Sequence, residues 1–147
     1  MLTINLYLAG AISYLKEIDE YDKAILWRIQ LINKLTDLNN KLGYIKYRCF
    51  DPTTNFEEND KTASNKTIVQ QNDYYLDKCD IMIVNLEHLD KSPGTLYEIY
   101  KYKFLNKPVI AFGNNDWADK PHVVESITVC LSNIDGVVDY LESYYYT

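Results

Sequence analysis

The chain has 147 residues, of which 47% are hydrophobic and 24% are charged. This length fits one domain with a single core, and the composition excludes disordered and fibrous proteins. The formal net charge is −6 and no Lys/Arg cluster stands out, so the phosphates of a nucleic-acid polymer would be repelled. We therefore expect one globular domain over residues 1–147 that does not bind nucleic-acid polymers.

The sequence also argues against membranes, disulfides and metals. No apolar run is long enough to span a membrane. Cys49, Cys79 and Cys130 are odd in number and widely spaced, which fits neither a disulfide framework nor a zinc site. His88 and His122 lack metal-ligand spacing. We expect free thiols in a reducing compartment, hence a cytoplasmic protein without a metal.

Strand-like and helical segments alternate along the chain. The predicted strands are Ile4–Ala9, residues 44–50, residues 80–86, Val109–Phe112 and residues 128–131. The predicted helices are Tyr21–Leu42, residues 66–78, residues 92–106, residues 121–126 and residues 134–145. The apolar run at 80–86 is typical of a strand buried on both faces of a parallel sheet.

The first helix has an apolar stripe and a clear end. Ile25, Ile29, Ile32 and Leu35 recur at intervals of three and four residues, and Gly43 is a typical C-terminal glycine. The alternation of elements predicts a doubly wound α/β/α sandwich with a roughly five-stranded parallel sheet in the flavodoxin-like order. Ligands of such folds bind at the carboxyl ends of the strands, here between the first and third strands. The segments expected there are residues 10–14, 51–56, 85–94 and 113–117.

Several familiar sites are excluded by missing residues. The loop after the first strand has neither a G-x-G-x-x-G pattern nor a Walker lysine, and it lacks the acidic residues of a response-regulator receiver. A helix start remains at Ser92-Pro93-Gly94-Thr95, where Ser92 can cap the helix and free N–H groups favour an anion or a hydroxyl-rich ligand. A purely structural cap is the alternative. Glu98 lies one turn further along.

The order of these motifs carries a family resemblance. The segments are Tyr7-Leu8-Ala9-Gly10-Ala11, Asn72-Asp73, the strand at 80–86, Ser92-Pro93-Gly94-Thr95-Leu96-Tyr97-Glu98-Ile99, and Lys107-Pro108-Val109-Ile110. They resemble the nucleoside 2-deoxyribosyltransferase family, which includes related deoxynucleoside 5′-monophosphate N-glycosidases.

The resemblance implies that Glu98 attacks the anomeric carbon of a 2′-deoxynucleoside and forms a covalent deoxyribosyl ester, which a second base or water then resolves. It implies that Tyr7 hydrogen-bonds and orients Glu98, and that Asp73 contacts the base, where it protonates or holds a ring nitrogen. A core aromatic and a helix-surface acid are the alternative interpretations of Tyr7 and Asp73. No cofactor is needed.

The remaining candidates lie at the strand ends, at the helix start and in a neighbouring subunit. The substrate-binding candidates are Gly10, Ala11, Phe50, Asp51, Pro52, Asn85, Ser92, Gly94 and Thr95. Phe50 or Phe56 could stack on the base. The resemblance also implies a homo-oligomer, a dimer or higher, in which Asn115 and Tyr146 reach a neighbour's site.

One departure from the family pattern leaves alternatives open. The family carries an aspartate six residues before the nucleophile, and this chain has Ser92 there. A serine at a helix N-terminus favours a phosphate, which predicts a hydrolase of deoxynucleoside 5′-monophosphates as the alternative to a transferase. Two further alternatives are a non-catalytic nucleotide-binding module and an enzyme that cleaves NAD or a related dinucleotide.

Overall fold

The structure is a computed structural model that describes residues 2–54, 64–117 and 120–145. Its five strands form one parallel sheet in the order β2-β1-β3-β4-β5. The strands are β1 (Ile4–Ala9), β2 (Tyr47–Phe50), β3 (Ile81–Asn85), β4 (Val109–Phe112) and β5 (Val129–Leu131). The helices are α1 (Ser13–Glu17), α2 (Tyr21–Leu42), α3 (Asn65–Lys78), α4 (Pro93–Phe104), α5 (Pro121–Val124) and α6 (Ile134–Tyr144). The predicted flavodoxin-like order is confirmed.

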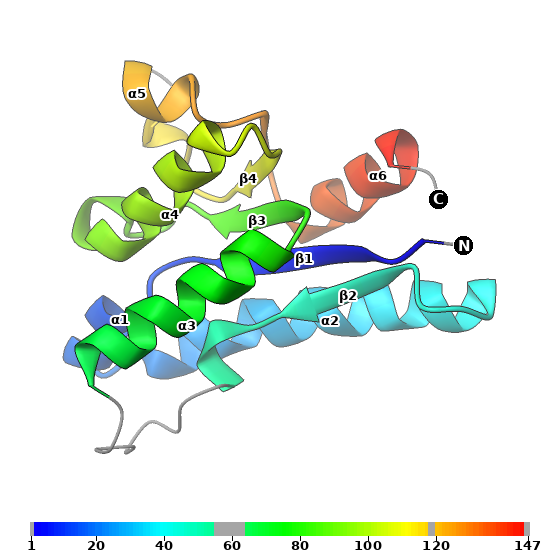
Figure 1. Cartoon of the computed structure of the whole chain (residues 1–147), viewed down its shortest axis with the longest axis horizontal. Helices are drawn as coiled ribbons and strands as arrows, with labels where there is room; N and C mark the ends of the chain where they lie inside the picture. Colours follow the sequence, from blue (N-terminus) through cyan, green and yellow to red (C-terminus); the bar gives the residue numbers. More distant parts are fainter. Residues whose placement is uncertain (1, 55–63, 118–119, 146–147) are drawn as a thin grey trace.

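Helices cover both faces of the sheet (Figure 1). One core cluster packs α2 and α6 on one face, and the other packs α3 and α4 on the opposite face. Because successive residues of a strand point to opposite faces, Leu6 and Leu8 of β1 lie in the first cluster, whereas Tyr7 and Ala9 lie in the second. Tyr7 is therefore directed toward the helices that carry the candidate acids.

The buried face of α2 differs from the predicted stripe. Trp27, Leu31 and Leu35 are buried, but Ile29 is 46% exposed. The predicted stripe is correct at Leu35 and wrong at Ile29, and the buried face of the helix also includes Arg28, whose side chain is completely buried. Trp27 is a core residue.

Two boundaries have local causes. Gly43 ends α2 in the left-handed conformation (φ 78°), and its N–H donates to the carbonyl of Asn39 at 2.9 Å. The turn that follows delays β2 to Tyr47, later than the predicted start at residue 44. The short helix α1 was not predicted, because its five residues are too few to show a periodicity.

The backbone carbonyls at the end of α3 accept hydrogen bonds from one side chain of α4 and from one that follows α4. Tyr102 Oη donates to the carbonyls of Leu76 at 2.7 Å and Cys79 at 3.1 Å. Lys107 Nζ donates to the carbonyls of Asp77 at 2.8 Å and Cys79 at 2.9 Å. The carbonyls that a helix end leaves open are thus paired within the protein.

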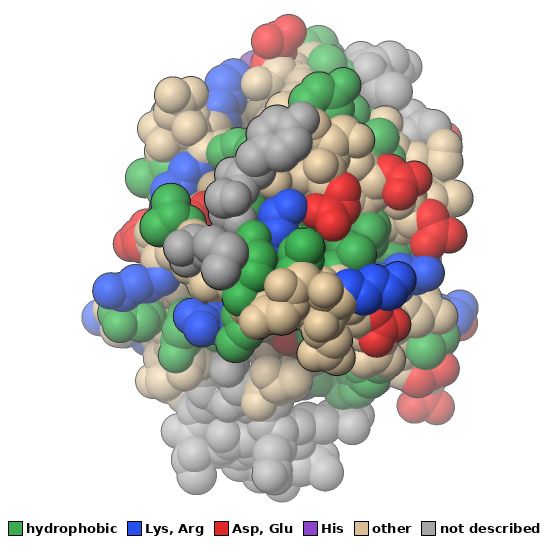
Figure 2. Space-filling model, turned by 90° about the vertical axis from the view of Figure 1, so that its right-hand side faces the viewer, with side chains coloured by type: hydrophobic (Ala, Val, Ile, Leu, Met, Phe, Trp, Pro, Cys, Tyr) green, Lys and Arg blue, Asp and Glu red, His purple; other side chains and the backbone are tan. Residues whose placement is uncertain are grey.

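The face that carries the two termini is chemically mixed. Figure 2 shows acidic, basic and hydrophobic side chains interspersed on this face, which lies at the amino ends of the strands. Asp80 lies at this edge, where its Oδ2 accepts from the N–H of Asn5 at 2.8 Å and so has a structural role. Among the described helices, none combines the length and apolar character needed to cross a membrane.

Candidate active site

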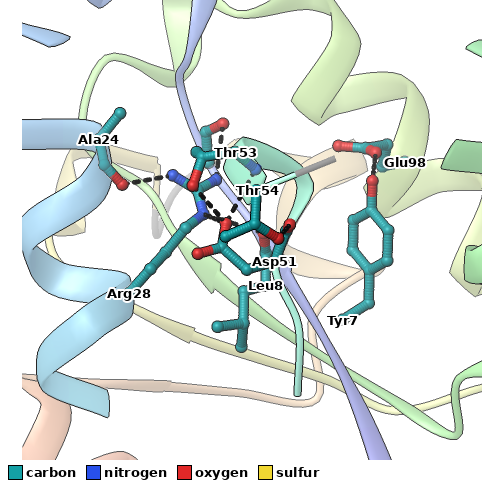
Figure 3. A network of polar contacts seen from close by, with 9 residues as sticks. Tyr7, Leu8, Ala24, Arg28, Asp51, Thr53, Thr54 and Glu98 are labelled. Carbon is teal, nitrogen blue, oxygen red and sulfur yellow. Dashed lines mark hydrogen bonds and ion pairs between the residues drawn. The ribbon is translucent and has the colours of Figure 1, made fainter. Parts of the chain in front are cut away.

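The central pair of the site is Tyr7 and Glu98. Tyr7 is completely buried on β1, and Glu98 lies in the second turn of α4. Tyr7 Oη donates a hydrogen bond to Glu98 Oε2 at 2.5 Å. This bond, which the family resemblance implied, joins residues that are far apart in the sequence (Figure 3).

The burial of this pair changes its acid–base properties. Burial raises the pKa of Glu98 to about 7, and the Asp73 carboxylate adds to this effect, while the Tyr7 hydrogen bond and the Arg28 guanidinium oppose it. Burial and the neighbouring Glu98 also raise the pKa of Tyr7. Tyr7 therefore remains a protonated donor at neutral pH, and Glu98 changes its charge near neutrality.

Three aromatic rings form a stack beside this pair. Phe50 of β2 stacks on Tyr7 with ring centroids 5.3 Å apart, and Tyr75 of α3 stacks on Phe50 at 4.0 Å. The faces of the Phe50 ring therefore contact Tyr7 and Tyr75, and they are not free to stack on a base. The other aromatic candidate, Phe56, lies outside the described residues.

Glu98 lines a cavity of about 360 Å³ at the carboxyl ends of the strands. Many of the predicted residues meet in its wall: Gly10, Pro52, Asp73, Ser92, Gly94, Thr95 and Glu98. The predicted segments 10–14, 51–56 and 85–94 also contribute Ile12, Ser13, Tyr14, Thr53, Lys91 and Pro93 to the wall. The remaining lining residues lie outside those segments: Lys16, Tyr21, Ile68, Val69, Asn72 and Tyr97. A volume of this size is within the range of small-molecule sites.

Asp51 lies behind the cavity wall instead of facing a ligand. It is 6% exposed, and its Oδ1 accepts from the N–H of Thr53 at 2.9 Å and from Thr53 Oγ1 at 2.7 Å. Arg28 Nε lies 3.6 Å from the same oxygen. The position of Asp51 therefore supports the turn that presents Pro52 and Thr53 to the cavity.

Arg28 is the polar residue that the sequence interpretation missed. Its guanidinium donates to the backbone carbonyls of Ala24 at 2.7 Å and Leu8 at 3.2 Å (Figure 3). It also donates to the carbonyl of Gly10 at 3.3 Å. Burial lowers its pKa to about 10, although Asp51 opposes this. Arg28 joins α2, the end of β1 and the turn after β2, which together form one side of the cavity. A single arginine in a helical pattern gives no signal for this role.

Ala11 and Asn85 are not brought to this cavity. Both line a separate space of about 250 Å³ beside Trp27. Asn85 follows Val84 on β3, so its side chain points to the α2 face, and its Oδ1 accepts from the N–H of Glu87 at 3.0 Å. The sequence placed Asn85 at the correct edge of the sheet but not on the face that holds Glu98.

The start of α4 is open toward the cavity. Ser92 does not cap the helix, as had been expected, because its hydroxyl donates to the carbonyl of His88 at 2.8 Å. No described side chain caps this end, and Gly94 and Thr95 line the cavity. Helix N-terminal amides favour an anion or a hydroxyl-rich ligand.

Two lysines add positive charge to this wall. Lys16 of α1 and Lys91, just before α4, both line the cavity. They lie far apart in the sequence, which is why no basic cluster was visible. The cavity wall therefore combines two cations and helix amides with the carboxyl groups of Asp73 and Glu98.

The two candidates for a neighbouring site remain predictions. Asn115 begins the short 3-10 helix η3 (Asn115–Trp117) after β4, and Tyr146 lies outside the described residues. Within residues 2–54, 64–117 and 120–145, no three His, Cys, Asp or Glu side chains group as metal ligands would.

Fold and cavity together define a doubly wound α/β protein with a partly buried tyrosine–carboxylate pair at the carboxyl ends of its strands. A family model described as nucleoside 2-deoxyribosyltransferase matches residues 6–129, and the chain belongs to this family. No curated protein matches the chain.

Two solved structures share the fold. A conserved protein from Enterococcus faecalis V583 is 16% identical, with a TM-score of 0.72 over 97% of this chain and 99% of that one. A 2-deoxyribosyltransferase from Bacillus psychrosaccharolyticus is 17% identical, with a TM-score of 0.60 over 92% of this chain and 91% of that one. At these identities the likeness concerns the fold.

Proposed function

We propose that the protein is an enzyme that cleaves the N-glycosidic bond of 2′-deoxynucleosides and transfers the sugar to another nucleobase. Membership of the family supports a glycosyl-transferring activity. The observation that carries the proposal is the 2.5 Å hydrogen bond from Tyr7 to a Glu98 carboxyl that lines the cavity.

In the proposed reaction, an ionised Glu98 oxygen attacks C1′ of the sugar. The C1′–N bond breaks with its electron pair going to the base, which takes up one proton as it leaves. A carboxylate can share the charge of an oxocarbenium-like transition state, so the substitution is split into two easier steps. A nitrogen of the second base then attacks C1′, releases Glu98 and loses one proton.

The other residues have supporting roles in this proposal. Tyr7 keeps Glu98 Oε2 in place, leaving Oε1 for the attack. Asp73 contacts the base, and Gly10, Pro52, Ser92, Gly94 and Thr95 surround the sugar and its 5′ end. Because the pKa of Glu98 is about 7, about half of the free enzyme carries the nucleophilic form at neutral pH.

Chromatography of the products tests this proposal. Deoxyadenosine with excess cytosine is expected to give adenine and deoxycytidine, and mass spectrometry of the quenched protein is expected to find a deoxyribosyl group on Glu98. Glu98→Ala should abolish both, whereas Glu125→Ala, at an exposed acid after α5, should not. Absence of product from every nucleoside and nucleotide would favour a non-catalytic binding module.

A hydrolase of deoxynucleoside 5′-monophosphates is the second candidate. Lys16, Lys91 and the uncapped start of α4 favour it, because they offer a phosphate two cations and free amides in the same cavity. Release of adenine from dAMP without transfer would support it. The Lys16→Ala/Lys91→Ala variant should then lower kcat/KM for dAMP about tenfold more than for deoxyadenosine. Equal losses would contradict this candidate.

We also propose a cytoplasmic homo-oligomer, in which Asn115 and Tyr146 complete the cavity of a neighbouring subunit. Light scattering after size exclusion measures the assembly, and Tyr146→Ala is expected to lower activity without changing its size. A fully active monomer would contradict this proposal.

A further inference from the structure

Two helices meet in a ladder of polar contacts at the cavity. Tyr97 and Lys101 lie one turn apart on α4, and Asp73 and Asp77 lie one turn apart on α3. Lys101 Nζ lies 3.4 Å from Asp73 Oδ1 and 3.3 Å from Asp77 Oδ1. Only the Tyr97–Asp73 end of the ladder lines the cavity.

The contacts of Asp73 define what it can offer a ligand. Tyr97 Oη donates to both carboxylate oxygens, at 3.1 Å to Oδ1 and 3.2 Å to Oδ2. With Lys101 as an ion-pair partner, the carboxylate lies between a hydroxyl donor and a cation. An ionised carboxylate only accepts hydrogen bonds, and its two oxygens have more lone pairs than these partners use.

We propose that Tyr97 is a specificity-determining residue, which together with Lys101 holds Asp73 as a hydrogen-bond acceptor and so selects nucleobases that present an amino group to the cavity. The inference rests on the proposed function, because it assumes that the cavity holds the base. It assigns Asp73 the role of an acceptor, so the proton taken up by the leaving base comes from solvent.

The competing interpretation is that these contacts only hold α3 against α4 and have no role in binding the base. The two interpretations differ in ligand dependence: loss of a purely structural contact would weaken all bases alike, whereas loss of an oriented acceptor weakens only bases with the matching donor. Adenine and purine are suitable probes because they differ only in the amino group.

The experiment is a calorimetric titration of adenine and of purine into the wild-type protein, Tyr97→Phe and Tyr74→Phe. Tyr74 is the matched control, because it lies beside Asp73 on α3, is 56% exposed and does not line the cavity. We expect the wild type and Tyr74→Phe to bind adenine about tenfold more tightly than purine, and Tyr97→Phe to lose most of this preference.

Each other outcome overturns the proposal. No preference for adenine in the wild type, an unchanged preference in Tyr97→Phe, or no binding of either base would do so. Because binding is measured without turnover, this result is separate from the product assay. A protein that prefers adenine but cleaves no nucleoside would keep the inference about Tyr97 and refute the proposed function.

Discussion

Replacing Glu98 by glutamine is expected to stabilise the folded protein at mildly alkaline pH. The pKa of Glu98 is raised from 4.5 to about 7 by burial, so between these values the folded state holds a proton that the unfolded chain has lost. Stability therefore falls as the pH rises through this window. At about 1.4 kcal/mol per pKa unit, the wild type loses about 3 kcal/mol between the two pKa values. Glutamine carries no charge and avoids this loss.

Urea unfolding followed by circular dichroism measures the effect. Glu98→Gln should exceed the wild type by about 3 kcal/mol near pH 8, and the difference should shrink toward zero near pH 4.5. The control Glu125→Gln, at an exposed carboxylate, should show no such pH dependence. A variant that is equally stable at both pH values, or less stable near pH 8, would refute the assignment of a buried, destabilising charge to Glu98.

Three further substitutions probe the surroundings of the site and the end of α2. Tyr7→Phe removes the hydrogen bond to Glu98 and should move the acid limb of the kcat/KM–pH profile upward by about one unit; an unmoved limb would contradict the role of Tyr7. Arg28→Met leaves Asp51 buried without its cation and should lower the free energy of unfolding by about 3 kcal/mol, so a loss below about 1 kcal/mol in urea would count against this ion pair. Gly43→Ala forces a side chain into the left-handed region and should cost about 1 kcal/mol, seen as a lower urea midpoint; an unchanged midpoint would refute this strain.

The order of the fold was accessible from the sequence because its signals are local. Most of the strands are short apolar runs, and each of the longer helices has an apolar stripe or a clear start and end, so the alternation indicated a parallel sheet. The buried face of α2 was less accessible. Periodicity treats Arg28 as a solvated residue, and only the backbone carbonyls of Leu8 and Gly10, which the fold brings to it, explain its burial.

The candidate site was predictable to the extent that a family pattern exists. The pattern indicated Tyr7 and Glu98, whose contact no spacing rule could have predicted because the two residues lie far apart in the sequence. It did not distinguish the two faces of a strand end, and Asn85, a substrate-binding candidate, lines the separate space beside Trp27. It was also silent on Tyr97, because a tyrosine beside the nucleophile becomes informative only when α3 places Asp73 against it.

Tyr102 and Lys107 bond the last carbonyls of α3 and thereby join it to α4. Opening either helix would break the same bonds, so the two should open in one step instead of fraying separately. Their amide protons are then expected to exchange with deuterium at similar rates. Because α3 carries Asp73 and α4 carries Glu98, denaturant would remove both acids from the cavity together, and no partly folded form should keep half of the site.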